Sequence, residues 1–184
     1  MEVIKRNIPN IIYGSLDGII TTFAIIAGVV GAKQNIKIAF ILALANLLAD
    51  GFSMGVSSYE SILQNEYPNH NLYRGIFTFL AFITIGFIPL SFFIWIIARN
   101  PPNLTFKKEY IKSIILLTLV AIILIGILKA HFKEPLIPGH SQRSQTEKNK
   151  IKVKIVLRTL LTCVIAGIIS YLVAHNLTVF LEKS

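Results

Sequence analysis

The sequence predicts an all-α polytopic membrane protein, and three observations support this fold class. Of its 184 residues, 54% are hydrophobic and 15% are charged, whereas soluble domains carry about 25% charged residues. Five apolar stretches each provide the roughly 20 residues that a helix needs to cross a bilayer. The stretches lack the alternating pattern of β-strands, and helices and closed β-barrels are the structures that can span a bilayer. We therefore expect five transmembrane helices.

Charged residues and helix breakers delimit these spans, and the whole chain (1–184) is expected to form a single transmembrane domain. Residues 133–154 are the one long connection. Because this stretch is polar and contains Pro135, Pro138 and Gly139, we expect a flexible basic loop there. The predicted helices cover about residues 11–32, 38–59, 75–98, 112–129 and 155–181.

The basic residues lie mainly in the connecting segments. The net charge of +9 would suggest nucleic acid in a soluble protein; here anionic lipid headgroups explain it, and we expect no nucleic-acid partner. The clearest case is the basic segment before the last span, which holds Lys148, Lys150, Lys152 and Lys154. With the N-terminus inside, 11 Lys and Arg residues fall on the cytoplasmic side and 7 on the other. This bias predicts a cytoplasmic N-terminus and an outer or lumenal C-terminus.

Recognisable signatures of catalysis are missing from the sequence. The single cysteine, Cys163, lies in an apolar run, so neither a disulfide nor a cysteine-based metal cluster can form within one chain. No phosphate-binding loop, activated nucleophile or zinc-protease motif is visible. We expect no enzymatic activity and no permanently bound cofactor.

Two acidic residues, Asp17 and Asp50, interrupt the first two spans. An ionised group near the middle of a spanning helix costs about 2.5–3.5 kcal/mol on insertion scales. Neither span contains a Lys or Arg that could pair with these carboxylates. One interpretation is that both line a water-filled path and bind a cation or proton; the other is that they are protonated and only hydrogen-bond a neighbouring helix.

Small and polar residues accompany both acids at helical steps of three and four. These stripes are either path-lining surfaces or packing surfaces, because small residues also let membrane helices approach closely. A packing surface alone would not need Asp17, Asn46 and Asp50, which favours a path. The other members are Gly14, Thr21, Ala24, Gly28 and Gly31 in the first span, and Ala39, Ala43, Ser53 and Ser57 in the second.

Met54 lies one turn after Asp50. A methionine in an apolar helix is often a flexible core residue. Beside carboxylates, however, its thioether suits a borderline or softer divalent metal better than Mg²⁺ or Ca²⁺, which prefer oxygen ligands.

Two motifs resemble signatures of the vacuolar iron transporter family. Residues 17–32 (Asp-Gly-Ile-Ile-Thr-Thr-Phe-Ala-Ile-Ile-Ala-Gly-Val-Val-Gly-Ala) resemble the family's first-helix motif. Residues 45–59, which include Ser53-Met54-Gly55 and end at Tyr59, resemble its second-helix motif. Gly86-Phe-Ile-Pro-Leu90 is similar to a motif of its third helix.

The resemblance implies a homodimer that exports Fe²⁺ or Mn²⁺ from the cytoplasm in exchange for protons. Its path would run between helices 1 and 2 of both subunits, in a cell membrane or a vacuole-type organelle membrane. The path-lining Asp and Met of the family fall on Asp17 and Met54.

The chain departs from the family pattern at several positions. A family Glu on the second helix falls on the uncharged Asn46, and Asp50 is expected to supply the missing carboxylate. An aromatic hydroxyl on the third helix of some members corresponds to Phe82. Longer members insert a metal-binding domain between helices 2 and 3, whereas this short form has only a brief polar loop. Its possible metal-entry residues are Glu60, Glu66 and His70.

Together these features predict a divalent metal transporter that binds its cargo through Asp17, Met54, Asp50 and Asn46. Two alternatives remain open. The chain could be a structural or assembly protein of the membrane that only keeps the packing stripes. It could also be a membrane-embedded enzyme with a bound metal, although no sequence feature calls for one.

Overall fold

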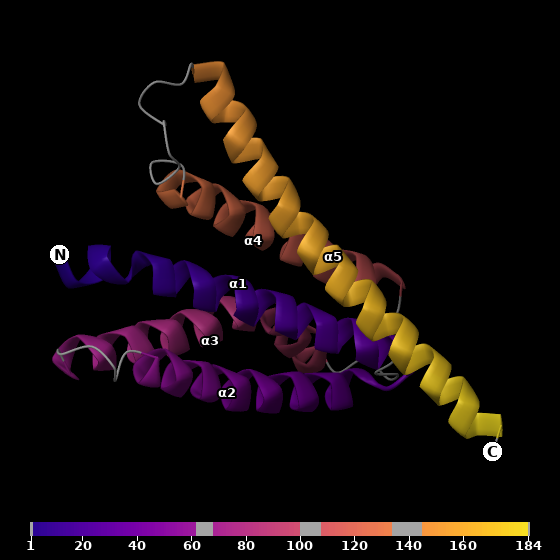
Figure 1. The fold of residues 1–184 in the computed structure, drawn as a ribbon. Helices are drawn as coiled ribbons and strands as arrows, with labels where there is room; N and C mark the ends of the chain where they lie inside the picture. The colour runs from indigo at the N-terminus through magenta and orange to yellow at the C-terminus, as the bar shows by residue number, and fades with distance from the viewer. Residues whose placement is uncertain (1, 62–67, 100–107, 134–144, 184) are drawn as a thin grey trace.

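The computed structural model describes residues 2–61, 68–99, 108–133 and 145–183, and this part of the chain is built from five α-helices (Figure 1). All five are long and apolar enough to cross a membrane. The predicted all-helical class and the five spans are therefore confirmed. The helices are α1 (Glu2–Gly31), α2 (Ile36–Glu60), α3 (Pro68–Ala98), α4 (Lys108–Lys133) and α5 (Gln145–Lys183).

Helix α1 is the central element, because it packs against all four other helices. On one side, α2 and α3 pack against each other and against α1; on the other, α4 and α5 form a second pair (Figure 1). One buried cluster joins Ile26 of α1, Leu47 of α2 and Phe82 of α3. A second cluster joins Ile19 of α1 to Ile122 of α4 and Cys163 of α5. Burying both faces of α1 holds the two helix groups together.

The turn between α1 and α2 is closed by backbone hydrogen bonds. Lys33 adopts a left-handed conformation, with φ of 54°. Its amide donates to the carbonyl of Val30, and the amide of Gln34 donates to that of Val29, which is the bonding pattern of a Schellman motif. Asn35 then caps α2 by accepting from the amide of Ile38 at 2.9 Å. These bonds let two long helices reverse direction within a few residues.

All five helices begin earlier than predicted, and α5 and α3 show why. Residues 133–154 were expected to form a flexible loop, but α5 begins at Gln145, so the basic segment 148–154 is helical. The prediction took polarity as a sign of flexibility, yet this segment contains neither proline nor glycine, and its four lysines are good helix formers. Helix α3 likewise begins at Pro68, since proline is well tolerated in the first turn of a helix.

Glycines allow α3 to lie directly against α1. A Cβ atom added to Gly14 would come 2.5 Å from the carbonyl oxygen of Thr78, and one added to Gly18 would collide with the carbonyl oxygen of Phe82. On the other side of α3, a Cβ on Gly75 would lie 2.7 Å from the carbonyl oxygen of Gly55 in α2. The backbone of α3 is thus in contact with both helices that carry the acidic residues.

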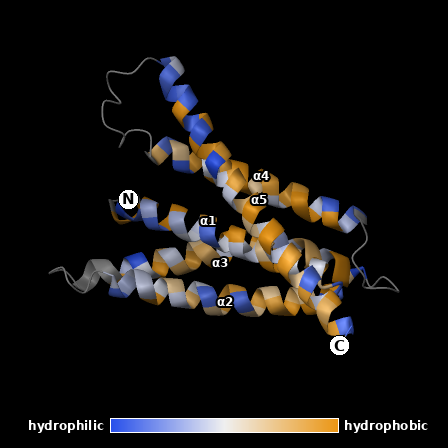
Figure 2. Cartoon of the chain, turned by 45° about the vertical axis from the view of Figure 1, so that its right-hand side comes forward, coloured by the Kyte–Doolittle hydropathy of each residue, from blue (hydrophilic) through white to orange (hydrophobic). Residues whose placement is uncertain are grey.

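The C-terminal end of α3 carries an aromatic and basic pair. The guanidinium of Arg99 lies over the ring of Trp95, 4.0 Å from its centroid, and Trp95 stacks on Phe92. Tryptophan and arginine in this arrangement are typical of the membrane–water interface. Hydrophilic residues also gather at helix ends and along the first part of α5 (Figure 2).

Candidate metal-transport site

The two intramembrane acids lie near each other, one on α1 and one on α2. Asp17 and Asp50 are both partly buried, and the two helices that carry them pack against each other. Within the described part of the chain, no basic side chain forms an ion pair with either carboxylate. Two like charges in an apolar region repel each other, and a cation placed between them would relieve that repulsion.

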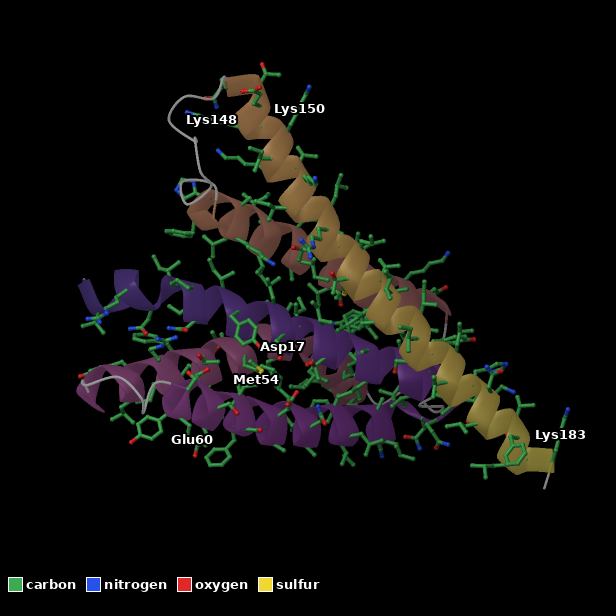
Figure 3. The ribbon with its side chains drawn as sticks, in the orientation of Figure 1. Asp17, Met54, Glu60, Lys148, Lys150 and Lys183 are labelled. Atoms are coloured by element: carbon green, nitrogen blue, oxygen red, sulfur yellow. The ribbon has the colours of Figure 1, made fainter. Side chains whose placement is uncertain are left out.

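Met54 brings a sulfur atom to the same region. It lies one turn after Asp50 on α2 and is partly buried against the cluster formed with Leu47 and Phe82. Figure 3 shows Asp17 and Met54 in the space between the α1 and α2 ribbons. The chain therefore offers two carboxylates and one thioether to an ion between these helices.

One residue of α3, Phe82, lies against the glycines that follow the two acids. Gly18 follows Asp17 and lies against the backbone of Phe82; Gly51 follows Asp50 and lies against the Phe82 ring. Phe82 is fully buried. Because the Phe82 ring lacks a hydroxyl group, it cannot donate a hydrogen bond to a carboxylate.

The polar stripe predicted on α2 is divided between two environments. Ala39 and Ala43 are buried in the cluster with α1 and α3. Asn46, Ser53 and Ser57 are exposed at the surface of the monomer. Asp50 is partly buried and lies between these two groups. In the single chain, the exposed polar residues of α2 are therefore not covered by another helix.

The small-residue stripe predicted on α1 packs against two different helices. Gly14 lies against α3, as described above. Gly28 lies against Ser170 and Gly31 against the backbone of Tyr171, both in α5. Thr21 is partly buried. In the single chain these glycines make helix contacts.

The proposed entry residues are only partly covered by the structure. Glu60 is exposed at the end of α2 (Figure 3). Glu66 lies outside the described residues, and His70 is placed only by its backbone in the first turn of α3. Among the residues whose side chains are described, no group of three His, Cys, Asp or Glu could hold a metal.

One polar network near the start of α1 escaped the sequence analysis. The Arg74 side chain donates to Oδ1 of Asn10 at 3.4 Å, and Asn10 donates to Oδ1 of Asn7 at 3.1 Å. Asn7 is buried and donates to the carbonyl of Val3 at 2.8 Å. Asn10 lies two turns before Asp17 on the same helix face, whereas Arg74 lies just before the predicted third span (75–98), so the spacing within one helix does not indicate this contact.

Comparison with known proteins shows the family to which the chain is related. A profile of the VIT family matches residues 8–67 and 60–175. A vacuolar iron transporter of Plasmodium falciparum (isolate 3D7) is 53% identical over 57 residues, or 31% of this chain and 21% of the relative. A vacuolar iron transporter of Plasmodium berghei (strain Anka) is 49% identical over 57 residues, with the same coverage.

A third relative, a vacuolar iron transporter of Toxoplasma gondii (strain ATCC 50861 / VEG), is 49% identical over 51 residues, 28% of this chain and 17% of the relative. The matches to these relatives thus span about a fifth of their lengths. The two profile matches overlap at residues 60–67, between the end of α2 and the start of α3. Since they extend over all five helices, the chain belongs to the VIT family.

Proposed function

We propose that the protein transports divalent metal, Fe²⁺ or Mn²⁺ or both, across a membrane. The observation that carries this proposal is the placement of Asp17 beside Asp50, with Met54 one turn away. Carboxylates alone would suit Mg²⁺ or Ca²⁺, whereas an added thioether favours a borderline metal. The metal is cargo, so the protein needs to bind it only transiently.

A homodimer would complete this binding site. Metal ions in proteins take about four to eight ligands, more than Asp17, Asp50 and Met54 of one chain supply. A two-fold axis along the exposed side of α2 would bring together two copies of these residues. It would also cover the exposed Asn46, Ser53 and Ser57, since polar groups in a span normally face other helices or water.

Proton antiport would follow from the same carboxylates. A metal binds the deprotonated form of its ligands, so protons and metal compete for Asp17 and Asp50. If the far compartment is more acidic than the cytoplasm, protons there displace the metal and drive export. This direction assumes a cytoplasmic N-terminus, as the distribution of Lys and Arg predicts, with the basic segment 148–154 close to anionic headgroups.

Transport into liposomes tests the proposal. The purified chain is reconstituted with an imposed pH gradient, and entry of Fe²⁺, Mn²⁺, Co²⁺, Zn²⁺ and Ca²⁺ is followed. We expect Fe²⁺ or Mn²⁺ flux that is lost in Asp17→Asn and retained in Glu109→Gln, a matched loss of one acid at the exposed start of α4.

Two outcomes would contradict parts of the proposal. If no metal enters faster than in Asp17→Asn, the chain is not a transporter, and the alternative of a structural or assembly protein is favoured. If Ca²⁺ enters as fast as Fe²⁺, the thioether of Met54 does not select the cargo. Cross-linking through a cysteine introduced at Ser53, in a Cys163→Ala background, tests the two-fold contact separately.

A further inference from the structure

The first part of α5 carries a charged and apolar surface that the proposed transport path does not use. Both Figure 1 and Figure 2 show this part of α5 extending away from α1, α2 and α3. Residues 145–158 contain five basic side chains and one acidic one. Their arrangement around the helix, rather than their number, points to a specific partner.

Three of the cations form a row on one face of the helix. Lys150, Lys154 and Arg158 follow each other at steps of four and are all exposed. They line a shallow hollow on α5. Within the described part of the chain, none of the three pairs with an acid. The acidic residue of this segment, Glu147, lies in the first turn, so the face keeps a net positive charge.

An apolar row runs beside these cations. Val153, Leu157 and Leu161 line the same hollow and are 56%, 59% and 59% exposed. The row continues into the membrane span through other exposed residues at steps of three and four. These are Val164, Ile168 and Leu172.

We propose that this face of α5 binds one anionic phospholipid, with its phosphate against Lys150, Lys154 and Arg158 and an acyl chain along Leu157, Leu161 and Ile168. The ten helical steps from Arg158 to Ile168 rise about 15 Å, which is about half of a hydrocarbon core roughly 30 Å thick. An occupant that is anionic at one end and apolar over one leaflet is a lipid, because a soluble anion or acidic peptide would leave the apolar row uncovered. The site is independent of the metal cargo.

Lys148 and Lys152 provide a matched control. They lie on the opposite side of the same helix turns and are partly buried. The double variants Lys150→Gln/Lys154→Gln and Lys148→Gln/Lys152→Gln therefore remove the same charge from the same segment. A diffuse attraction between a basic segment and an anionic membrane would be weakened equally by both, whereas a site on one face would not.

The experiment measures binding of phosphatidylglycerol to the full chain in detergent, by native mass spectrometry, with phosphatidylcholine as the uncharged comparison. Each basic group near an anionic surface contributes about 1 kcal/mol, a factor of about five. We expect Lys150→Gln/Lys154→Gln to bind phosphatidylglycerol about 25-fold more weakly, and Lys148→Gln/Lys152→Gln to change binding less than fivefold. Circular dichroism checks that each variant remains helical.

Two further arms test the apolar half of the site. Leu157→Ser should weaken binding of phosphatidylglycerol without changing that of glycerol phosphate, its soluble headgroup analogue. Equal losses in the two double variants would overturn the proposal, as would glycerol phosphate binding as tightly as the lipid. Lipid binding is measured without metal or a pH gradient. A failure to bind lipid therefore does not contradict metal transport, and a failure to transport metal does not contradict lipid binding.

Discussion

Gly18 of α1 lies against the backbone of Phe82 in α3 so closely that no side chain fits between them. Gly18 directly follows Asp17, so this contact fixes the height and rotation of the intramembrane carboxylate. Gly51, which follows Asp50 in α2, packs against the ring of Phe82. Both acids are therefore positioned through glycines that pack on one residue of α3.

Gly18→Ala is expected to separate α1 from α3. The added Cβ would collide with the carbonyl oxygen of Phe82, and a backbone atom of a helix cannot move aside without moving the helix. Overpacking of this kind costs about 1–3 kcal/mol. Thermal unfolding in detergent should show a lower midpoint than in the wild-type chain.

Gly126→Ala is the matched control. A Cβ at Gly126 would lie 3.5 Å from Val156, an ordinary van der Waals contact, and replacing a helical glycine by alanine gains up to about 1 kcal/mol. Its unfolding midpoint should be unchanged or higher. Equal midpoints for the two variants would contradict the close contact at Gly18.

The contact between Arg74 and Asn10 should appear in a double-mutant cycle. The Arg74 side chain donates to Asn10 at 3.4 Å, while its Nε is buried and lacks a partner within the described residues. Asn10→Leu removes the acceptor and is expected to destabilise the fold by about 1–3 kcal/mol. In an Arg74→Met background the same change should cost much less, because no charge is left unpaired.

Chemical unfolding of the wild type, both single variants and the double variant gives the coupling energy. A coupling energy near zero would mean that the two side chains do not stabilise each other. Gel filtration in detergent checks that each variant is recovered without aggregation.

The five spans could be predicted because each depends on a local property, a long apolar run. The start of α5 could not, because polarity alone does not separate a solvated helix from a loop; the run of helix formers from Gln145 contained that information. Likewise, Pro68 marks the first turn of α3 rather than a break. Local composition thus predicted which segments are helices better than where they begin.

The two acids could be predicted from the sequence because an ionisable group in an apolar span is unusual, whichever helices the span packs against. The partners of the glycines could not be found in the same way. Gly14 and Gly28 share one stripe on α1, yet Gly14 packs on α3 and Gly28 on α5. Which helix covers each part of α1 depends on packing across the whole bundle, and helical spacing does not contain this information.

Met54→Leu should change selectivity while leaving the fold intact. Leucine has nearly the same volume, and such exchanges usually cost less than about 1.5 kcal/mol. Loss of the sulfur should lower the flux of Fe²⁺ relative to Ca²⁺, because only the thioether distinguishes the borderline metal from a hard one. Competition of each metal for uptake in liposomes measures the ratio. An unchanged ratio would make Met54 a packing residue.

Asp17→Asn should separate stability from function. An ionised carboxylate inside a spanning helix is costly, so a neutral amide of the same shape at position 17 should raise the free energy of unfolding, by about 1 kcal/mol. Metal flux should be lost in the same variant, because an amide is a much weaker ligand than a carboxylate. Excess metal should raise the unfolding midpoint of the wild-type chain, and it should have little effect on Asp17→Asn. A structural carboxylate would behave in the opposite way, since its replacement would lower stability and leave the response to metal unchanged.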